Sequence, residues 1–301
     1  MATLFQVDSI SVLHEMFNYE KPKNSLISVI DLNKIKPDPS HLNEQLIMGF
    51  YTISLKNGMD CAVKYGHQTY DFNEGSMMFM APGQVTVAQY SQLDRTAKEN
   101  WMLCFHPDLI RKSKLARDIH EYHFFEYSVS EALHLSDAEK NTVTAIVRSI
   151  EAEYSQNLDS YSYDLILSHL ELLLNYCNRF YGRQFLTRHA VNQDVVSQFE
   201  VMLKKQIDLA NLEESGIPRV KELADTLCYS PSYLSDLLKK ETGKTIQEHI
   251  QLHLVEKAKT LLRSTTKPIS EISYSLGFDY PTHFSKFFKT HTGMSPKAYR
   301  Q

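Results

Sequence analysis

Residues 269–299 read ISEISYSLGFDYPTHFSKFFKTHTGMSPKAY and repeat the pattern of residues 220–249, VKELADTLCYSPSYLSDLLKKETGKTIQEH. The two copies lie about fifty residues apart, and the later copy has one extra residue before its second half. Self-similarity at a fixed period indicates a repeated structural unit. The apolar positions coincide in pairs: Val220 with Ile269, Leu223 with Ile272, Leu227 with Leu276, Leu234 with Phe284, Leu237 with Phe287 and Leu238 with Phe288.

Each copy predicts a short helix, a tight turn and a second helix. In the first copy, the residues at helical spacing i, i+3, i+4 and i+7 from Val220 are apolar, which predicts one buried stripe. Ser230-Pro231 then has the N-cap oxygen and the N1 proline that start a helix. Gly243 supplies the left-handed stop. Two short helices joined by a tight turn form a helix-turn-helix unit, whose second helix fits the DNA major groove.

A continuous helix is predicted between the copies, over residues 245–263, because this stretch lacks Gly and Pro. At about 1.5 Å per residue it is roughly 28 Å long, close to the roughly 34 Å that separates successive major-groove segments on one face of DNA. Residues 215–301 carry 13 Lys and Arg against 8 Asp and Glu. A stacked helical repeat without a ligand is the alternative, but such repeats need three or more copies for stability.

These residues resemble the double helix-turn-helix domain of the AraC/XylS family of bacterial transcription regulators. The resemblance covers about a hundred residues up to the C-terminus and is most specific in LGF…FSKFFK.HTG.SP..YR. It implies seven helices, with the second helix of each unit reading DNA. It also implies phosphate contacts at Lys239, Lys240 and Lys289. The residues expected to face bases or phosphates are Ser230, Ser232, Tyr233, Ser235 and Asp236 in the first unit and Pro281, Thr282, His283, Ser285 and Lys286 in the second.

Two residues depart from the family pattern. Cys228 stands where the family usually has glycine, so the first turn must tolerate a side chain. Asp236 stands where many members have a basic or amide residue; it either accepts a hydrogen bond from a cytosine amino group or pairs with Lys239 or Lys240 along the helix. We therefore rank Lys286 above Asp236 as a base reader.

Length, composition and charge predict two domains of a globular protein. The 301 residues are 43% hydrophobic and 23% charged. Residues 1–194 carry 17 Lys and Arg against 24 Asp and Glu, whereas residues 195–301 carry 15 against 12. The first residues lack the pattern of a secretion signal, and no apolar run reaches membrane-spanning length. The scattered Cys61, Cys104, Cys177 and Cys228 indicate reduced thiols in the cytoplasm.

Residues 25 to about 110 predict an antiparallel β-barrel or jelly roll. Short alternating strands are separated by turn signals at Asn57-Gly58 and Pro82-Gly83. The resemblance implies a cupin-like barrel, and EGSMMFMAPGQVTVA is similar to its strand–turn–strand segment. We expect no metal, because Thr86 stands at a usual ligand position and His41, His67 and His106 form no paired motif.

A pocket for a small-molecule effector is predicted in this barrel, lined by Tyr51, Tyr65, Phe79 and Trp101. For each of these aromatic residues separately, a position in the hydrophobic core is the simpler interpretation. No cofactor is expected.

Residues 136–181 predict helices that close an effector-sensing and dimerisation domain, residues 1–181. The last of these helices is apolar on two sides, because Leu165 and Leu172 add to its main stripe. One side can pack on the barrel and the other on a second copy of the chain in a homodimer; a fully internal helix is the alternative. The polar residues 182–194 are expected to be a linker to the DNA-binding domain, residues 195–301.

The sequence therefore predicts a cytoplasmic bacterial transcription regulator that binds double-stranded DNA and is controlled by a small-molecule effector. RNA polymerase is a further partner if the protein is an activator. Two alternatives remain: an N-terminal domain that only dimerises or binds a protein partner, and a barrel enzyme fused to a DNA-binding domain. We expect no enzyme, since no catalytic constellation of Ser/His/Asp, Cys/His or metal ligands has a convincing spacing.

Overall fold

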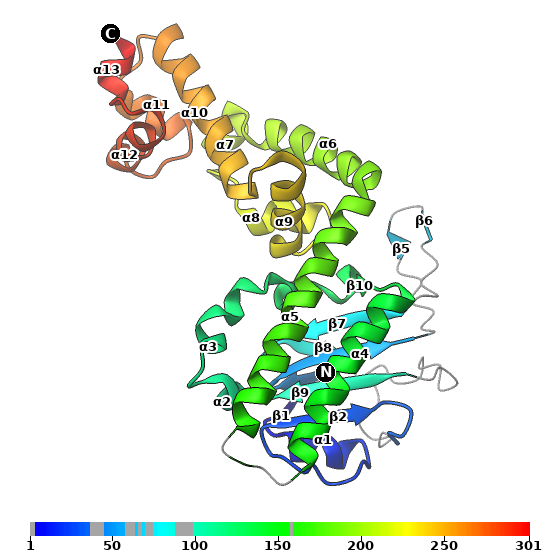
Figure 1. Ribbon diagram of the computed structural model, residues 1–301. Coiled ribbons are helices and arrows are strands. Elements are labelled where there is room, and N and C mark those ends of the chain that lie inside the picture. The colour runs from blue at the N-terminus through cyan, green and yellow to red at the C-terminus, as the bar shows by residue number, and fades with distance from the viewer. Residues whose placement is uncertain are drawn as a thin grey trace. The chain divides into compact units, whose positions relative to one another are not determined.

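The computed structural model describes residues 4–36, 45–57, 64–65, 68–69, 75–87, 99–156, 159 and 161–301. The chain forms two compact units, Met1–Gln184 and Phe185–Gln301 (Figure 1). All strands in the described ranges belong to the first unit, and the second unit is helical. Among the described residues, no helix is both long enough and apolar enough to cross a lipid bilayer.

A five-stranded antiparallel sheet lies at the centre of the first unit and confirms the predicted antiparallel strands. Its order is β10-β7-β4-β9-β2. The strands are β2 (Ile27–Asp31), β4 (Tyr51–Lys56), β7 (Ser76–Met80), β9 (Trp101–Phe105) and β10 (Leu133–His134). A second sheet pairs β1 (Leu4–Val7) parallel to β3 (Gln45–Met48), and β3 antiparallel to β8 (Val85–Val87). A third pairs β5 (Lys64–Tyr65) with β6 (Gln68–Thr69). The Pro82-Gly83 turn joins β7 to β8, with Gly83 at φ +83°, whereas Gly58 lies outside the described residues.

Two long helices cover one face of the five-stranded sheet (Figure 1). They are α4 (Asp137–Ser155), which begins with a Ser136/Glu139 capping box, and α5 (Ser162–Thr187). Trp101 of β9 points to this side, where its indole Nε1 donates to Thr144 Oγ1 of α4 at 3.1 Å. The connection from β9 to α4 contains α2 (Pro107–Ile110), α3 (Leu115–Asp118), η2 (Ile119–Glu121), η3 (His123–Glu126) and η4 (Val129–Glu131).

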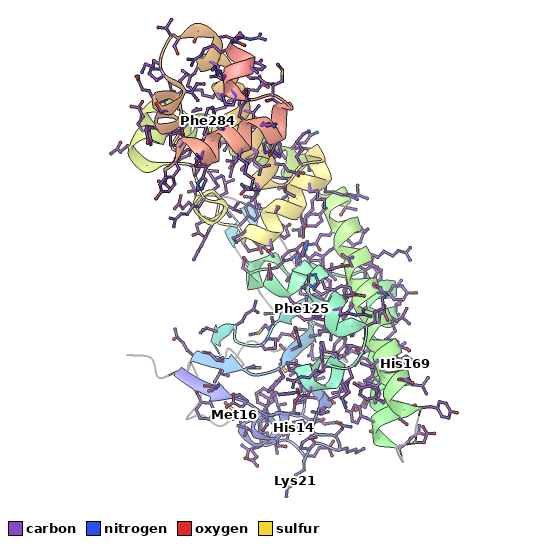
Figure 2. All side chains as sticks on the ribbon, turned by 90° about the vertical axis from the view of Figure 1, so that its left-hand side faces the viewer. His14, Met16, Lys21, Phe125, His169 and Phe284 are labelled. Atoms are coloured by element: carbon purple, nitrogen blue, oxygen red, sulfur yellow. The ribbon has the colours of Figure 1, made fainter. Side chains whose placement is uncertain are left out.

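The opposite face of the sheet packs against α1 (Ile10–Met16) and the three-stranded sheet. Met102 and Cys104 of β9 share a buried cluster there with Leu46 and Met48 of β3. Figure 2 shows Phe125 on the α5 side of the strands and Met16 of α1 on the side away from α5. The five-stranded sheet is therefore covered on both faces.

The predicted linker, residues 182–194, is mostly helical. Helix α5 continues to Thr187, and α6 (His189–Gln206) begins two residues later. Two of its polar side chains are buried and hydrogen-bonded: Gln184 Oε1 accepts from His134 N at 2.8 Å, and Asn192 Nδ2 donates to Phe185 O at 2.8 Å. These hydrogen bonds stabilise the helical course of the segment.

The second unit contains the repeat that the sequence predicts. Beyond the end of α5, residues 185–301 form eight helices, α6 to α13, whereas the resemblance implied seven. The first of them is α6. The remaining seven are α7 (Leu209–Ser215), α8 (Val220–Thr226), α9 (Pro231–Thr242), α10 (Ile246–Ser264), α11 (Ile269–Ser275), α12 (Pro281–Thr292) and α13 (Pro296–Arg300). Helices α8 and α11 have 7 residues each, and α9 and α12 have 12 each.

The two tight turns have the same backbone geometry although their residues differ. Gly277, between α11 and α12, has φ +78°, and Cys228, between α8 and α9, has φ +61°. The left-handed region costs a residue with a Cβ about 1–2 kcal/mol. The turn at Cys228 thus tolerates a side chain, as the sequence predicts, and the exposed position of Cys228 makes room for it.

Candidate nucleic-acid interface

Helix α12 has a buried apolar side and an exposed polar side. Phe284 and Phe288 are both 0% exposed, four residues apart on the inner stripe. Pro281 occupies the first helical turn, and Gly293 ends the helix in the left-handed conformation. The exposed side chains on the outer side are Thr282, His283, Lys286 and Lys289, whereas Pro281 and Ser285 are half-buried. A rigid helix with hydroxyl, imidazole and ammonium groups on one face has the donors that bases and phosphates accept.

Helix α9 occupies the equivalent place in the first unit but offers a different face. Ser230 is its N-cap and accepts a hydrogen bond from Tyr233 N at 3.3 Å. Lys239 and Lys240 are exposed in the last turn, whereas Ser232, Ser235 and Asp236 are half-buried. Positive charge is therefore concentrated at the C-terminal end of α9, where it also interacts favourably with the helix dipole.

Tyr233 is not on the exposed face of α9, and the expectation that it is exposed is wrong. Its exposed fraction is 4%, its ring stacks on Tyr229 with centroids 5.5 Å apart, and Phe185 lies 5.1 Å away. Tyr233 is four residues before Leu237 and so extends the inner stripe of the helix. Its counterpart in the second copy, His283, is exposed.

Two exposed aromatic residues next to α12 were missed by the sequence reasoning. Tyr280, the N-cap residue of α12, is 61% exposed, and its ring lies edge-on to His283 with centroids 5.3 Å apart. Tyr274 on α11 is 55% exposed. The extra residue in the second copy, just before α12, is the sequence signal that could have drawn attention to Tyr280.

Helix α10 joins the two helix-turn-helix units and is fixed at both ends. Near its start, His249 Nδ1 lies 3.0 Å from Glu200 Oε1 of α6, and His249 Nε2 lies 2.8 Å from Thr242 Oγ1 at the end of α9. Burial lowers the pKa of His249 despite the opposing effect of the Glu200 carboxylate. Near its end, the Arg263 guanidinium lies 4.8 Å over the ring of Tyr299 in α13. Helix α10 thus joins the two helix-turn-helix units and contacts neighbouring helices at both of its ends.

The N-terminal aromatic residues selected from the sequence lie on the helix-covered face of the five-stranded sheet. Tyr51 stacks on Phe105 at 4.9 Å, Phe79 packs on Phe124 at 4.4 Å, and Trp101 is 1% exposed. The side chain of Tyr65 lies outside the described residues. The prediction that Tyr51, Phe79 and Trp101 line the interior between the sheets therefore does not fit their positions.

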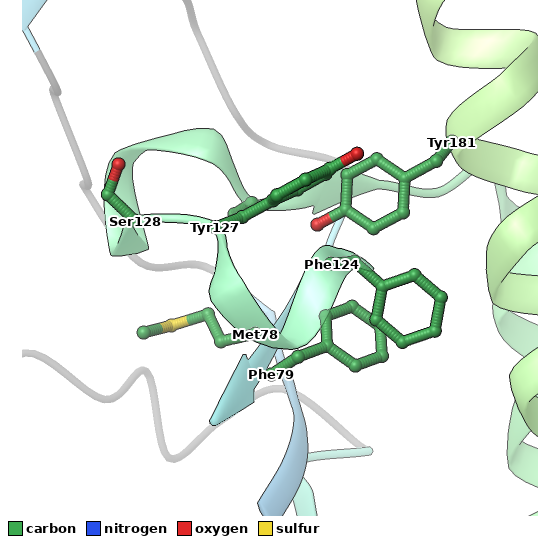
Figure 3. A pocket seen from close by; sticks show the side chains of 7 residues that line it. Met78, Phe79, Phe124, Tyr127, Ser128 and Tyr181 are labelled. Carbon is green, nitrogen blue, oxygen red and sulfur yellow. The ribbon is translucent and has the colours of Figure 1, made fainter. Parts of the chain in front are cut away.

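One small cavity lies beside the described residues on that face of the sheet. A cavity of about 10 Å³ lies beside Phe79, Phe124 and Tyr181 (Figure 3), room for one water molecule at most. The rings of Phe79 and Phe124 both pack against Tyr181 there, with centroids 5.9 and 5.6 Å away.

The proposed dimer residues Leu165 and Leu172 lie on α5, seven residues apart, and each is 45% exposed. Tyr161, four residues before Leu165, is 70% exposed. Seven residues are two helical turns, so the two leucines lie on the same side of α5. Both leucines are therefore partly exposed on one side of the helix.

Comparisons with known proteins match the helical unit. A family model described as "Helix-turn-helix domain" matches residues 223–301. The Uncharacterized HTH-type transcriptional regulator YobQ of Bacillus subtilis is 37% identical over 27% of this chain and 34% of its own length. The Arabinose operon regulatory protein of Escherichia coli is 35% identical over 27% of this chain and 28% of its own length. This chain thus spans about a third of the length of these curated relatives.

A solved structure, the C-terminal domain of AraT, a response regulator from Geobacillus stearothermophilus, is 32% identical and covers 35% of this chain and 83% of that chain, with a TM-score of 0.32.

Proposed function

Because residues 223–301 are an AraC-type helix-turn-helix domain, we propose that this protein is a sequence-specific DNA-binding regulator of transcription in the bacterial cytoplasm. The observation that carries the proposal is the exposed face of α12, where Thr282, His283 and Lys286 lie outside the buried Phe284 and Phe288. A recognition helix needs this arrangement, with its apolar side anchored and its polar side open to base edges.

In this proposal both helix-turn-helix units bind DNA, and each contacts it through a different set of residues. Helix α10 has 19 residues, about 28 Å at 1.5 Å per residue, which supports binding in successive major-groove segments of one DNA face. In the second unit, Thr282, His283, Ser285 and Lys286 approach bases. In the first unit, Ser232, Ser235 and Asp236 do so, while the exposed Lys239 and Lys240 contact phosphates, as does Lys289 in the second. Ser230 and Pro281 start the two recognition helices.

Selection of binding sites from random double-stranded DNA with the full-length protein tests this function. We expect a motif in two blocks about one helical turn apart. A single block would mean that only one unit reads sequence. Absence of any enriched motif, with only salt-sensitive background binding, would contradict the proposal.

Lys286→Ala is expected to weaken binding to the selected site about tenfold and to broaden the second block, because one good base contact contributes about 1–3 kcal/mol of discrimination. Titrations at two salt concentrations measure the affinity. Lys267→Ala is the matched control: it removes the same charge from an exposed lysine that pairs with Glu271 at 3.0 Å, away from α12. Equal effects of the two substitutions would show that Lys286 contributes only general charge.

The exposed side of α5 supports a homodimer in which Leu165 and Leu172 pack against a second copy. The double substitution Leu165→Asp/Leu172→Asp is expected to convert dimers to monomers in sedimentation velocity and to weaken binding to a two-site DNA at least tenfold through lost avidity. Val201→Asp, at a 71% exposed position on α6, is the control. A variant that remains dimeric would exclude this face of α5 as the interface.

Control by a small-molecule effector in the N-terminal unit completes the proposal, with the two sheets as a cupin-like barrel. An effector can regulate only if it binds the DNA-competent and the incompetent states with different affinities. RNA polymerase is the further partner of an activator. The two sheets with a buried core next to α1 support a binding domain of this kind.

A further inference from the structure

The residue that precedes α12 differs in chemistry from the one that precedes α9. Helix α9 is capped by Ser230, whose hydroxyl accepts a hydrogen bond from Tyr233 N at 3.3 Å. Thr245 and Ser295 cap α10 and α13 in the same way. Helix α12 is preceded instead by Tyr280, which makes no side-chain cap hydrogen bond. Because a serine or threonine at this position stabilises a helix, the second helix-turn-helix unit lacks a stabilising interaction that the first one has.

The ring of Tyr280 lies on the surface of the second unit. It is 61% exposed, and it meets the ring of His283 edge-on, with centroids 5.3 Å apart and planes at 70°. His283 is exposed as well, and its backbone nitrogen donates to Tyr280 O at 3.0 Å. A ring that is mostly exposed adds little to the hydrophobic core. Neither capping nor burial therefore accounts for a tyrosine at this position.

The equivalent residues of the first unit form no such exposed pair. Ser230 corresponds to Tyr280, because each is the N-cap residue of the second helix of its unit. Tyr233 corresponds to His283, but it is 4% exposed and packs against Tyr229. The exposed aromatic pair is thus a feature of α12 that α9 does not share.

The pair lies at the end of α12 from which a recognition helix reads DNA. In helix-turn-helix proteins the N-terminal residues of the second helix contact the base edges. Tyr280 and His283 lie one before and three into this helix, within its first turn. They present two different groups next to each other, an apolar ring and an imidazole N–H that can donate a hydrogen bond.

These two groups complement the major-groove edge of thymine. Thymine presents a C5-methyl group and the acceptor O4, whereas cytosine has an amino donor and no methyl group, and neither purine has a methyl group. A phosphate is a poorer partner for this end of α12, because the exposed carboxylate of Asp279 immediately precedes Tyr280 and would repel it. The chemistry of the pair therefore favours one base over the backbone.

We propose that Tyr280 and His283 together read one thymine in the DNA segment bound by α12. The ring of Tyr280 packs against the C5-methyl group, and the imidazole of His283 donates a hydrogen bond to O4. This inference rests on the proposed function, because it requires α12 to lie in the major groove. It adds Tyr280 as a specificity-determining residue and confines this thymine requirement to the second block of the binding site.

The test uses the full-length protein and the site selected from random DNA. Each thymine of the second block is replaced in turn by deoxyuridine, which lacks only the methyl group. At one position the replacement is expected to weaken binding about fourfold, the factor that corresponds to one buried methyl group. A second block without thymine, or one in which no replacement weakens binding, overturns the proposal.

Substitutions of Tyr280 assign the effect to its ring. Tyr280→Ser introduces the residue that caps α9, so it is expected to keep or raise the Tm of the free protein. It should also bind thymine and deoxyuridine at the sensitive position equally well. Tyr280→Phe keeps the ring and should keep the preference for thymine. A Tyr280→Ser variant that still distinguishes the two bases, or a Tyr280→Phe variant that does not, overturns the proposal.

Tyr274→Ser is the matched control, because it removes another tyrosine, 55% exposed on α11, from the same unit. This variant is expected to keep the preference for thymine over deoxyuridine. If it loses that preference as Tyr280→Ser does, the effect is not specific to Tyr280 and the proposal is overturned.

His283→Ala tests the contact with O4. A 5-methylcytosine·guanine pair keeps the methyl group but replaces O4 by an amino donor. The preference of the wild-type protein for thymine·adenine over this pair is expected to fall about threefold or more in His283→Ala, since the donor that distinguishes them is lost. An undiminished preference overturns the proposal.

The same experiments separate this inference from the proposed function. An enriched motif whose second block is insensitive to deoxyuridine removes the thymine contact and leaves the DNA-binding function intact. Absence of any enriched motif removes the DNA-binding function and this inference with it.

Discussion

Phe284→Ala is expected to destabilise the C-terminal unit by about 3–5 kcal/mol, the usual cost of removing a fully buried phenylalanine. Phe284 is 0% exposed, and its ring lies 5.5 Å from Phe278 and 5.8 Å from Phe288. The cavity would open under the exposed face of α12, so binding to the selected DNA should be lost as well. Guanidinium unfolding followed by circular dichroism at 222 nm measures the change.

The chain provides an internal reference for this measurement. Trp101 belongs to the first unit, so its fluorescence reports unfolding there, whereas the ellipticity has its largest contribution from helices that include all of the second unit. The circular dichroism midpoint should fall while the fluorescence midpoint stays near the wild-type value. Phe287→Ala, at a half-buried position of the same helix, is the matched control and should cost about 1–2 kcal/mol. Equal losses in both variants would contradict the proposed core of α12.

Gly277→Ala is expected to cost about 2–4 kcal/mol, from the left-handed backbone and from a steric clash. Gly277 has φ +78°, and an added Cβ would lie 3.0 Å from the carbonyl carbon of Gly216 and 3.0 Å from the backbone nitrogen of Ile217. Because both neighbours are backbone atoms, the connection between α7 and α8 would have to shift. Thermal and chemical unfolding of the full-length variant measure the loss.

Cys228→Gly is the opposite change at the equivalent turn. It is expected to stabilise the protein by up to about 1 kcal/mol, since glycine removes the left-handed strain at φ +61° but increases the entropy of the unfolded chain. The expectation is that the left-handed position favours glycine in both turns. It would be contradicted if Gly277→Ala raised the free energy of unfolding, or if Cys228→Gly lowered it by more than about 1 kcal/mol.

The helical unit could be predicted closely because its signals are local. The prolines at positions 231 and 281 begin α9 and α12, and Gly243 and Gly293 end them, as the sequence indicates. The predicted helix over residues 245–263 is α10, Ile246–Ser264. Capping and left-handed glycines depend on a few neighbouring residues, so a single sequence carries them.

The exposure of a side chain in one copy of the repeat does not predict the exposure of the equivalent side chain in the other copy. Positions 233 and 283 are equivalent in the repeat, but Tyr233 is buried beside Phe185 whereas His283 is exposed. Phe185 lies far from the repeat in the sequence, on a segment whose polar residues predicted a linker. No local pattern predicts that contact.

The sequence by itself determined the two helix-turn-helix units, the helix that joins them and the presence of antiparallel strands. Only the tertiary structure decided which side of each strand lies beneath the helices. The five-stranded sheet is buried on both faces, so β9 is apolar at every position and β4 is buried at four consecutive ones. A strand covered on both sides loses the polar–apolar alternation that distinguishes its faces. The partners across the strands then make the distinction: Trp101 and Tyr51 lie beneath helices, and Thr52 and Ser54 lie on the opposite face of the sheet.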